Sequence, residues 1–189
     1  MTESGRRPRA DARRNRERLL AEADAVFRAQ GTNASLEGIA RRAGVAIGTL
    51  YAHFPNRRAL LGALLHQRND ALFARGADLL DEPGAAAALT AWVHAVIAHA
   101  AAYQGLAAVL AEGVDDEASE LHQACVEMTD IGDRLIARAR EAGALRREAT
   151  GADIFALMNA AAWVAEQMSA DQAGRLVELA MAGLLVPSS

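Results

Sequence analysis

The positions of the helix breakers limit the fold of this chain more than any other feature. Its four prolines stand at positions 8, 55, 83 and 187, and the long segments between them contain none. Alanine, leucine, glutamate and arginine, all strong helix formers, dominate those segments. No run of five residues alternates between apolar and polar side chains, which is the pattern of a half-buried strand. The chain is therefore predicted to be all-α.

Apolar periodicity between the breaks predicts about nine helices. Four of them are expected before Pro83, at residues 13–30, 36–43, 46–54 and 57–81. The others are expected after Gly84, at residues 85–102, 105–113, 117–142, 151–168 and 171–185. Ser35 and Asn56 are predicted N-caps, since their side-chain oxygens can accept hydrogen bonds from the free N–H groups of a first turn.

Composition excludes several classes of protein. Hydrophobic residues make up 52% of the 189 residues, too many for a disordered chain. No apolar run approaches the roughly 20 residues that cross a bilayer, and Glu3 and Asp11 argue against a transit peptide. The single cysteine, Cys125, allows no internal disulfide and fits a reducing compartment. We therefore expect a cytoplasmic protein that makes no contact with a membrane.

Charge is distributed unevenly along the chain. Residues 1–58 hold twelve arginines and six acidic residues, a formal charge of +6. The remaining residues hold eight arginines and eighteen acidic residues, a formal charge of −10. This asymmetry is expected when only the front of a protein meets a polyanion. Charge alone is equally compatible with a solvated tail and charged helix faces.

The segment SLEGIARRAGVAIGTLYAHF, residues 35–54, meets the physical requirements of a helix-turn-helix. Ala40 is small where the following helix crosses close to it, and Gly44 permits the left-handed backbone of the turn. Apolar side chains at the expected inner positions lock the two helices together: Ile39, Ala43, Val45 and Leu50. Two helices joined by a glycine turn also occur in bundles that do not bind DNA, so this alternative stays open.

The residues of this segment carry a family resemblance. The run AGVAIGTLYAHFPNRRALLGALL resembles the signature of the TetR family of repressors, and RERLLAEADAVFRAQG and SLEGIA are similar to that family's first two helices. The resemblance covers residues 13 to about 68. Further on, AHAAAYQGLAAVL and EAGALRREATGADI resemble the SbtR-like type of regulatory half. The resemblance implies a dimer formed through the last two helices and no enzymatic activity.

Three positions depart from the family pattern. Thr32 stands where an aromatic residue is usual, which predicts a different contact between the first helix and the motif. Ala46 replaces the frequent serine N-cap of the recognition helix, a change that costs about 1 kcal/mol. Arg57 replaces a common lysine, which keeps the charge and changes its geometry.

The recognition helix is expected to direct Leu50 and Phe54 inward. By resemblance, Thr49, Tyr51 and His53 match positions that hold the phosphate backbone, while Ile47, Gly48 and Ala52 lie where bases are approached. Small apolar groups there favour contacts with thymine methyls. The candidate DNA-binding residues are Ser35, Arg41, Arg42, Ala46, Ile47, Gly48, Thr49, Tyr51, Ala52, His53 and Arg57. The alternatives are packing roles for Tyr51 and His53 and a solvated face at Arg41 and Arg42.

The later helices carry apolar stripes that surround a predicted ligand cavity. Its candidate liners are Trp92, Val96, Cys125, Met128, Thr129, Phe155, Met158 and Asn159. Such stripes are also typical of a plain core. Few of these side chains are polar, which predicts an apolar or weakly polar organic effector. His122, Cys125 and Met128 are spaced as soft metal ligands, but they have no clustered partners, so we expect neither a metal nor a cofactor.

The predicted dimer interface lies on the last two helices, with Ile154, Leu157, Ala161, Val164, Leu176, Leu179 and Ala180. The expected organisation is a disordered basic arm at residues 1–12, a DNA-binding domain at 13–58 and a sensing and dimerisation domain at 59–186. Together these features predict a repressor that a small molecule releases from a palindromic operator. The alternatives are a helical scaffold for other proteins and a regulator without an effector. No catalytic constellation is present, so an enzyme is not expected.

Overall fold

The structure, a computed structural model, describes residues 6–111 and 120–186. Within these ranges it is all-α, as predicted, and its one strand-like feature is a bridge between Leu145 and Leu185. The helices are α1 (Arg6–Gln30), α2 (Leu36–Arg42), α3 (Ile47–His53), α4 (Arg57–Asp81), α5 (Ala85–Ala100), α6 (Leu106–Ala111), α7 (Glu120–Glu141), α8 (Gly151–Gln167) and α9 (Ala170–Leu184). Residues 112–113 and 117–119, which were also predicted to be helical, lie outside the described residues.

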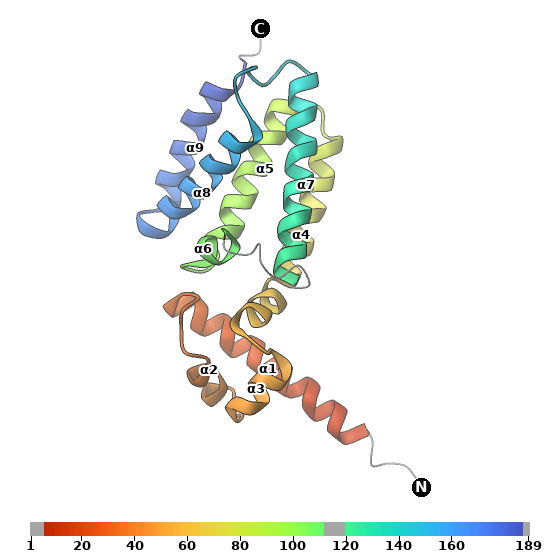
Figure 1. Cartoon of the computed structure of the whole chain (residues 1–189), viewed down its shortest axis with the longest axis vertical. Helices are drawn as coiled ribbons and strands as arrows, with labels where there is room; N and C mark the ends of the chain where they lie inside the picture. The colour runs from red at the N-terminus through yellow and green to blue at the C-terminus, as the bar shows by residue number, and fades with distance from the viewer. Residues whose placement is uncertain (1–5, 112–119, 187–189) are drawn as a thin grey trace.

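Helix α1 begins seven residues before its predicted start. Residues 6–12 are helical, so the prediction of a disordered arm is wrong for them, and residues 1–5 lie outside the described part of the chain. A side-chain pair at helical spacing supports the added turns, because Arg14 bonds to Asp11. In Figure 1 this end of α1 projects beyond the rest of the molecule.

Helix α4 has the predicted bounds and belongs to both halves of the molecule, as expected. Asn56 accepts a hydrogen bond of 2.8 Å from the N–H of Ala59 and so fixes the first turn. The first half of α4 contributes Leu60, Leu61 and Leu65 to a core shared with α1, α2 and α3. Its second half contributes Leu72 and Leu79 to the core of the bundle. The first core thus extends past residue 58, and Figure 1 shows α4 running from one unit into the other.

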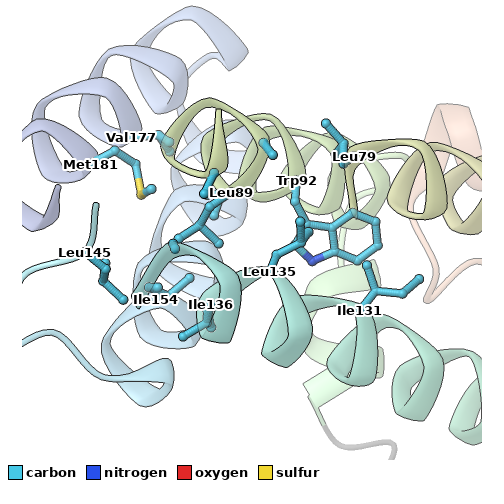
Figure 2. Close-up of a cluster of buried hydrophobic side chains, with 14 of the residues drawn as sticks. Leu79, Leu89, Trp92, Ile131, Leu135, Ile136, Leu145, Ile154, Val177 and Met181 are labelled. Atoms are coloured by element: carbon cyan, nitrogen blue, oxygen red, sulfur yellow. The ribbon is translucent and has the colours of Figure 1, made fainter. Parts of the chain in front are cut away.

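The bundle core is built around the indole of Trp92, which is 1% exposed. Two glycines leave room for the ring. A Cβ built on Gly76 of α4 would lie 2.8 Å from the indole, and one on Gly132 of α7 would lie 3.3 Å from its Nε1. Figure 2 shows the ring between α4 and α7, with Leu79, Ile131 and Leu135 around it. Trp92 therefore joins α5 to both neighbouring helices.

The loop between α5 and α6, residues 101–105, ties the bundle to the DNA-binding unit. The Thr32 N–H donates to the carbonyl of Gln104 at 2.8 Å, and the Tyr103 hydroxyl donates to Asp24 of α1 at 2.6 Å. Burial, with the bond to Asp24, raises the pKa of Tyr103 to about 12. Gly105 has a φ of 82°, and a Cβ there would lie 2.7 Å from the Thr32 hydroxyl. Thr32, unusual at this position, is therefore a contact between the two units.

Candidate functional site

The helix-turn-helix is assembled by local interactions. Ser35 caps α2, because its hydroxyl oxygen accepts a hydrogen bond of 3.1 Å from the N–H of Gly38. The Glu37 carboxylate accepts hydrogen bonds from the Glu37 backbone N–H and from the Ser35 hydroxyl, and both lower the pKa of Glu37. The turn passes through Gly44 at a φ of 67°, and the Val45 N–H donates to the carbonyl of Ala40 at 3.0 Å. These bonds fix the start of α3 relative to α2.

Helix α3 has the orientation that its apolar positions predict. Leu50 and Phe54 are buried at 0% and 2% exposure. Tyr51 is 46% exposed, and the other outward positions are the exposed Ala46, Gly48 and Ala52 and the half-buried Thr49 and His53. Ile47 is half-buried and packs partly against the core of the DNA-binding unit. Ala46 makes no side-chain capping hydrogen bond, as expected.

Two arginines of the predicted interface already have partners within the chain. Arg57 donates through Nη1 to the carbonyls of Thr32 and Ala34, the latter at 2.6 Å, and so holds the α1–α2 connection. Arg42 forms an ion pair of 2.8 Å with Glu22 of α1. Arg41 is exposed. The contacts of Arg57 therefore position the motif and do not leave its charge free to bind a phosphate.

A cavity of about 270 Å³ opens in the bundle between α5, α6, α7 and α8. Its volume equals that of about nine liquid waters of roughly 30 Å³ each. All eight predicted ligand residues line it: Trp92, Val96, Cys125, Met128, Thr129, Phe155, Met158 and Asn159. Thr129, Phe155 and Asn159 are exposed, and so they stand at the mouth of the cavity. Burial raises the pKa of the Cys125 thiol, which keeps it protonated at neutral pH.

His99 also lines the cavity, although the sequence analysis did not single it out. It is 4% exposed, and its Nε2 has no hydrogen-bond partner within residues 6–111 and 120–186. Burial, with a smaller effect of the nearby Arg68 charge, lowers the pKa of His99 from 6.5 to about 4. The apolar run of α5 contains two ionisable residues, His94 and His99, and the sequence does not indicate which of them is buried.

The depressed pKa of His99 makes stability depend on pH. In the unfolded chain the pKa of this histidine is close to 6.5. Between pH 6.5 and about 4, therefore, the unfolded state binds the proton and the folded state does not, so the free energy of unfolding decreases as the pH is lowered. Lowering the pH from 7 to 5 is expected to reduce the free energy of unfolding by about 2 kcal/mol through this group. Urea unfolding at both pH values measures the change. The His99→Phe variant should lack this part of it, and identical pH dependence in both proteins would contradict the assignment.

The predicted dimer residues divide into buried and accessible groups. Ile154 and Ala161 are 2% and 1% exposed and belong to the protomer's own core, so their prediction as interface residues is wrong. Leu157, Val164 and Ala180 are half-buried. Leu176 and Leu179 are 43% and 73% exposed on α9. The structure adds two apolar side chains that the sequence analysis missed, Trp163 at 59% and Met168 at 61% exposure.

Two negative observations apply to the described ranges. No helix within residues 6–111 or 120–186 is both long and apolar enough to pass through a membrane. The same residues contain no group of three or more histidine, cysteine or carboxylate side chains arranged to hold a metal ion.

Comparison with known proteins identifies both halves of the chain. Residues 19–64 match the family model of bacterial regulatory proteins of the tetR family. Residues 82–186, more than half of the chain, match the model described as transcriptional regulator SbtR-like, C-terminal domain.

Individual relatives agree with the family models. The TetR transcriptional regulator SCO0520 from Streptomyces coelicolor, whose crystal structure is known, is 33% identical in sequence to this chain. The two structures superpose with a TM-score of 0.60, and the match covers 92% of this chain and 99% of that one. The TetR transcription regulatory protein from Mycobacterium vanbaalenii is 32% identical, with a TM-score of 0.55 and coverage of 94% and 99%. The HTH-type transcriptional regulator TtgW of Pseudomonas putida is 41% identical over 68 residues, which are 35% of this chain and about half (51%) of that protein.

The helix-turn-helix, the helical bundle behind it and these matches lead to one conclusion. The chain belongs to the TetR family of bacterial DNA-binding transcriptional regulators and carries an SbtR-like C-terminal domain.

Proposed function

We propose that this regulator is a homodimeric repressor that a small organic molecule, bound in the cavity, releases from a palindromic operator. One observation carries the proposal: the same indole lines the cavity and packs against the helix that carries the DNA-binding unit. Trp92 is part of the cavity wall, and a Cβ on Gly76 of α4 would lie 2.8 Å from its ring. A molecule that shifts Trp92 therefore also displaces α4.

Operator reading is assigned to the exposed face of α3. Gly48 and Ala52 on this face are small, so they can approach thymine methyl groups in the major groove, and we propose that Thr49 and Tyr51 hold phosphates. In a two-fold dimer the two recognition helices must match half-sites about 34 Å apart. Because arginines displace counterions from the phosphates, the affinity should fall steeply with salt.

Removal of the Thr49 hydroxyl or of the Tyr51 side chain should weaken operator binding. Thr49→Ala and Tyr51→Ala are each expected to cost about 1–3 kcal/mol of specific binding free energy. Neither side chain is part of a buried core, so the unfolding free energy should stay within about 0.5 kcal/mol of wild type. Gel-shift titrations measure the binding. Thr90→Ala on α5 serves as a control remote from α3, and wild-type operator affinity in both α3 variants would contradict this assignment.

Release requires that the effector bind one arrangement of the dimer better than the other. A difference of about 1–3 kcal/mol is typical of such coupling. The cavity walls are mostly apolar, which favours an apolar or weakly polar effector. Gel-shift titrations on the DNA upstream of the chain's own gene, with and without candidate apolar molecules, test the proposal. A dimer that binds this DNA but is never released by any cavity-bound molecule would be a regulator without an effector.

A further inference from the structure

Among the described residues that line the cavity, one buried residue is polar, His99. His99 lies in the last turn of α5, and Ala100, Ala107 and Leu110, which line the same cavity, are apolar. Nε2 of His99 is buried and finds no donor or acceptor in the structure. A buried polar atom without a partner destabilises the site until some molecule supplies the missing hydrogen bond. The Thr129 and Asn159 side chains are exposed at the mouth and belong to a different part of the wall.

The charge of the lining limits what can enter. Burial lowers the pKa of His99 to about 4, so its ring is neutral at pH 7. Among the described lining residues there is no arginine, and the chain contains no lysine. The remaining charge in the wall is Asp133, an exposed carboxylate. An anion inside the cavity would therefore lose its hydration without direct contact to a cationic side chain of the wall, which is unfavourable. Arg68, whose charge acts on His99, is not one of the lining residues.

We propose that the cavity takes an uncharged, mainly apolar alcohol or phenol whose hydroxyl group hydrogen-bonds to His99. A neutral imidazole has one donor and one acceptor nitrogen, and a hydroxyl group both donates and accepts. It therefore satisfies Nε2 in either tautomer. A carboxylate is excluded by its charge, and a hydrocarbon leaves Nε2 without a partner. This inference rests on the proposed function, because it specifies the ligand of the same cavity.

His99 also lies close to the contacts that join the two units. It stands four residues before Tyr103, which donates to Asp24 of α1, and five before Gln104, whose carbonyl accepts from Thr32. A hydroxyl group anchored at His99 therefore acts directly on the end of α5 that leads into this loop. Alcohols should accordingly release DNA better than hydrocarbons of the same shape.

Three probes with one ring system separate the chemical classes: 1-naphthol, naphthalene and 1-naphthoate. Equilibrium dialysis against the full-length protein gives each dissociation constant. Wild-type protein should bind 1-naphthol about two- to tenfold more tightly than naphthalene, the range for one neutral hydrogen bond. It should bind 1-naphthoate at least about tenfold more weakly than 1-naphthol. Gel shifts with the same probes should rank DNA release in the same order.

Two variants assign the effect to His99. His99→Phe keeps an aromatic ring and should bind naphthalene as well as wild type but lose the preference for 1-naphthol. His94→Phe, on the same helix, is the matched control, because His94 pairs with Glu178 of α9 and does not line the cavity. It should keep the wild-type preference. Circular dichroism confirms that each variant is folded, and His99→Gln, which restores a hydrogen-bonding group, should regain part of the preference.

The outcomes separate this inference from the function on which it rests. An unchanged preference for 1-naphthol in His99→Phe, or tighter binding of 1-naphthoate than of 1-naphthol, would overturn the role of His99 and leave the cavity as an effector site. A wild-type protein that binds DNA but none of the three probes would overturn the inference, whereas the effector-responsive function is decided separately by the gel-shift titrations with other apolar molecules.

Discussion

Replacing Trp92 with alanine is expected to lower the free energy of unfolding by about 3–5 kcal/mol. The indole is among the largest fully buried side chains, and it fills the space that Gly76 and Gly132 leave open on the two flanking helices. Neither glycine has a side chain that can move into the vacated volume, so the cavity would persist in the folded protein. Urea unfolding followed by circular dichroism measures the loss.

Two glycine substitutions serve as matched controls, and they are expected to change the free energy of unfolding in opposite directions. Gly76→Ala would place a methyl group 2.8 Å from both Trp92 and Ile131, and it should destabilise the fold by about 1–3 kcal/mol. Gly174→Ala on α9 meets no atom within 4 Å and should stabilise its helix by up to about 1 kcal/mol. If Gly76→Ala were as stable as wild type, the ring would not be held between the helices. Because Trp92→Ala is expected to destabilise the fold, a loss of DNA binding in this variant would be explained by unfolding. It would not show that Trp92 contacts the effector.

Helix bounds were predictable where the signals are local. The ends of α4 match the prediction because Asn56 caps its first turn and Pro83 follows its last residue. The start of α1 was missed because an arginine-rich segment resembles a disordered tail. The pair of Asp11 with Arg14, three residues apart, favours helix at the end of that segment instead.

The residues of the cavity were predictable where helix periodicity alone determines which side chains share a face. The stripes of α5, α7 and α8 placed all eight predicted residues on one cavity, because residues three and four apart share a helix face. Helix α8, however, is apolar on two faces, and sequence alone cannot tell which of them meets the protomer's own core. For this reason Ile154 and Ala161 were assigned to the dimer, while Trp163 was overlooked. His99 was missed because its environment depends on tertiary packing.

The last two helices carry several large exposed apolar side chains. Trp163 and Met168 belong to α8 and its C-terminal end, and Leu176 and Leu179 belong to α9. The two helices pack against each other along one flank of the bundle (Figure 1). Several large exposed apolar side chains on two adjacent helices are typical of a protein–protein interface. A second copy of this chain, related by a two-fold axis, is the partner that we propose for it.

Leu179→Glu is therefore expected to convert the dimer into monomers at micromolar concentration. Leu179 is 73% exposed in the protomer, so the change should leave the protomer fold intact, but two-fold symmetry would bury two unpaired carboxylates, at several kcal/mol each. Sedimentation equilibrium measures the mass, and gel shifts should show an operator affinity at least about 100-fold weaker, because a monomer engages one half-site. Val126→Glu, at an exposed apolar position on α7, should remain dimeric. A dimeric Leu179→Glu protein would place the interface on another surface.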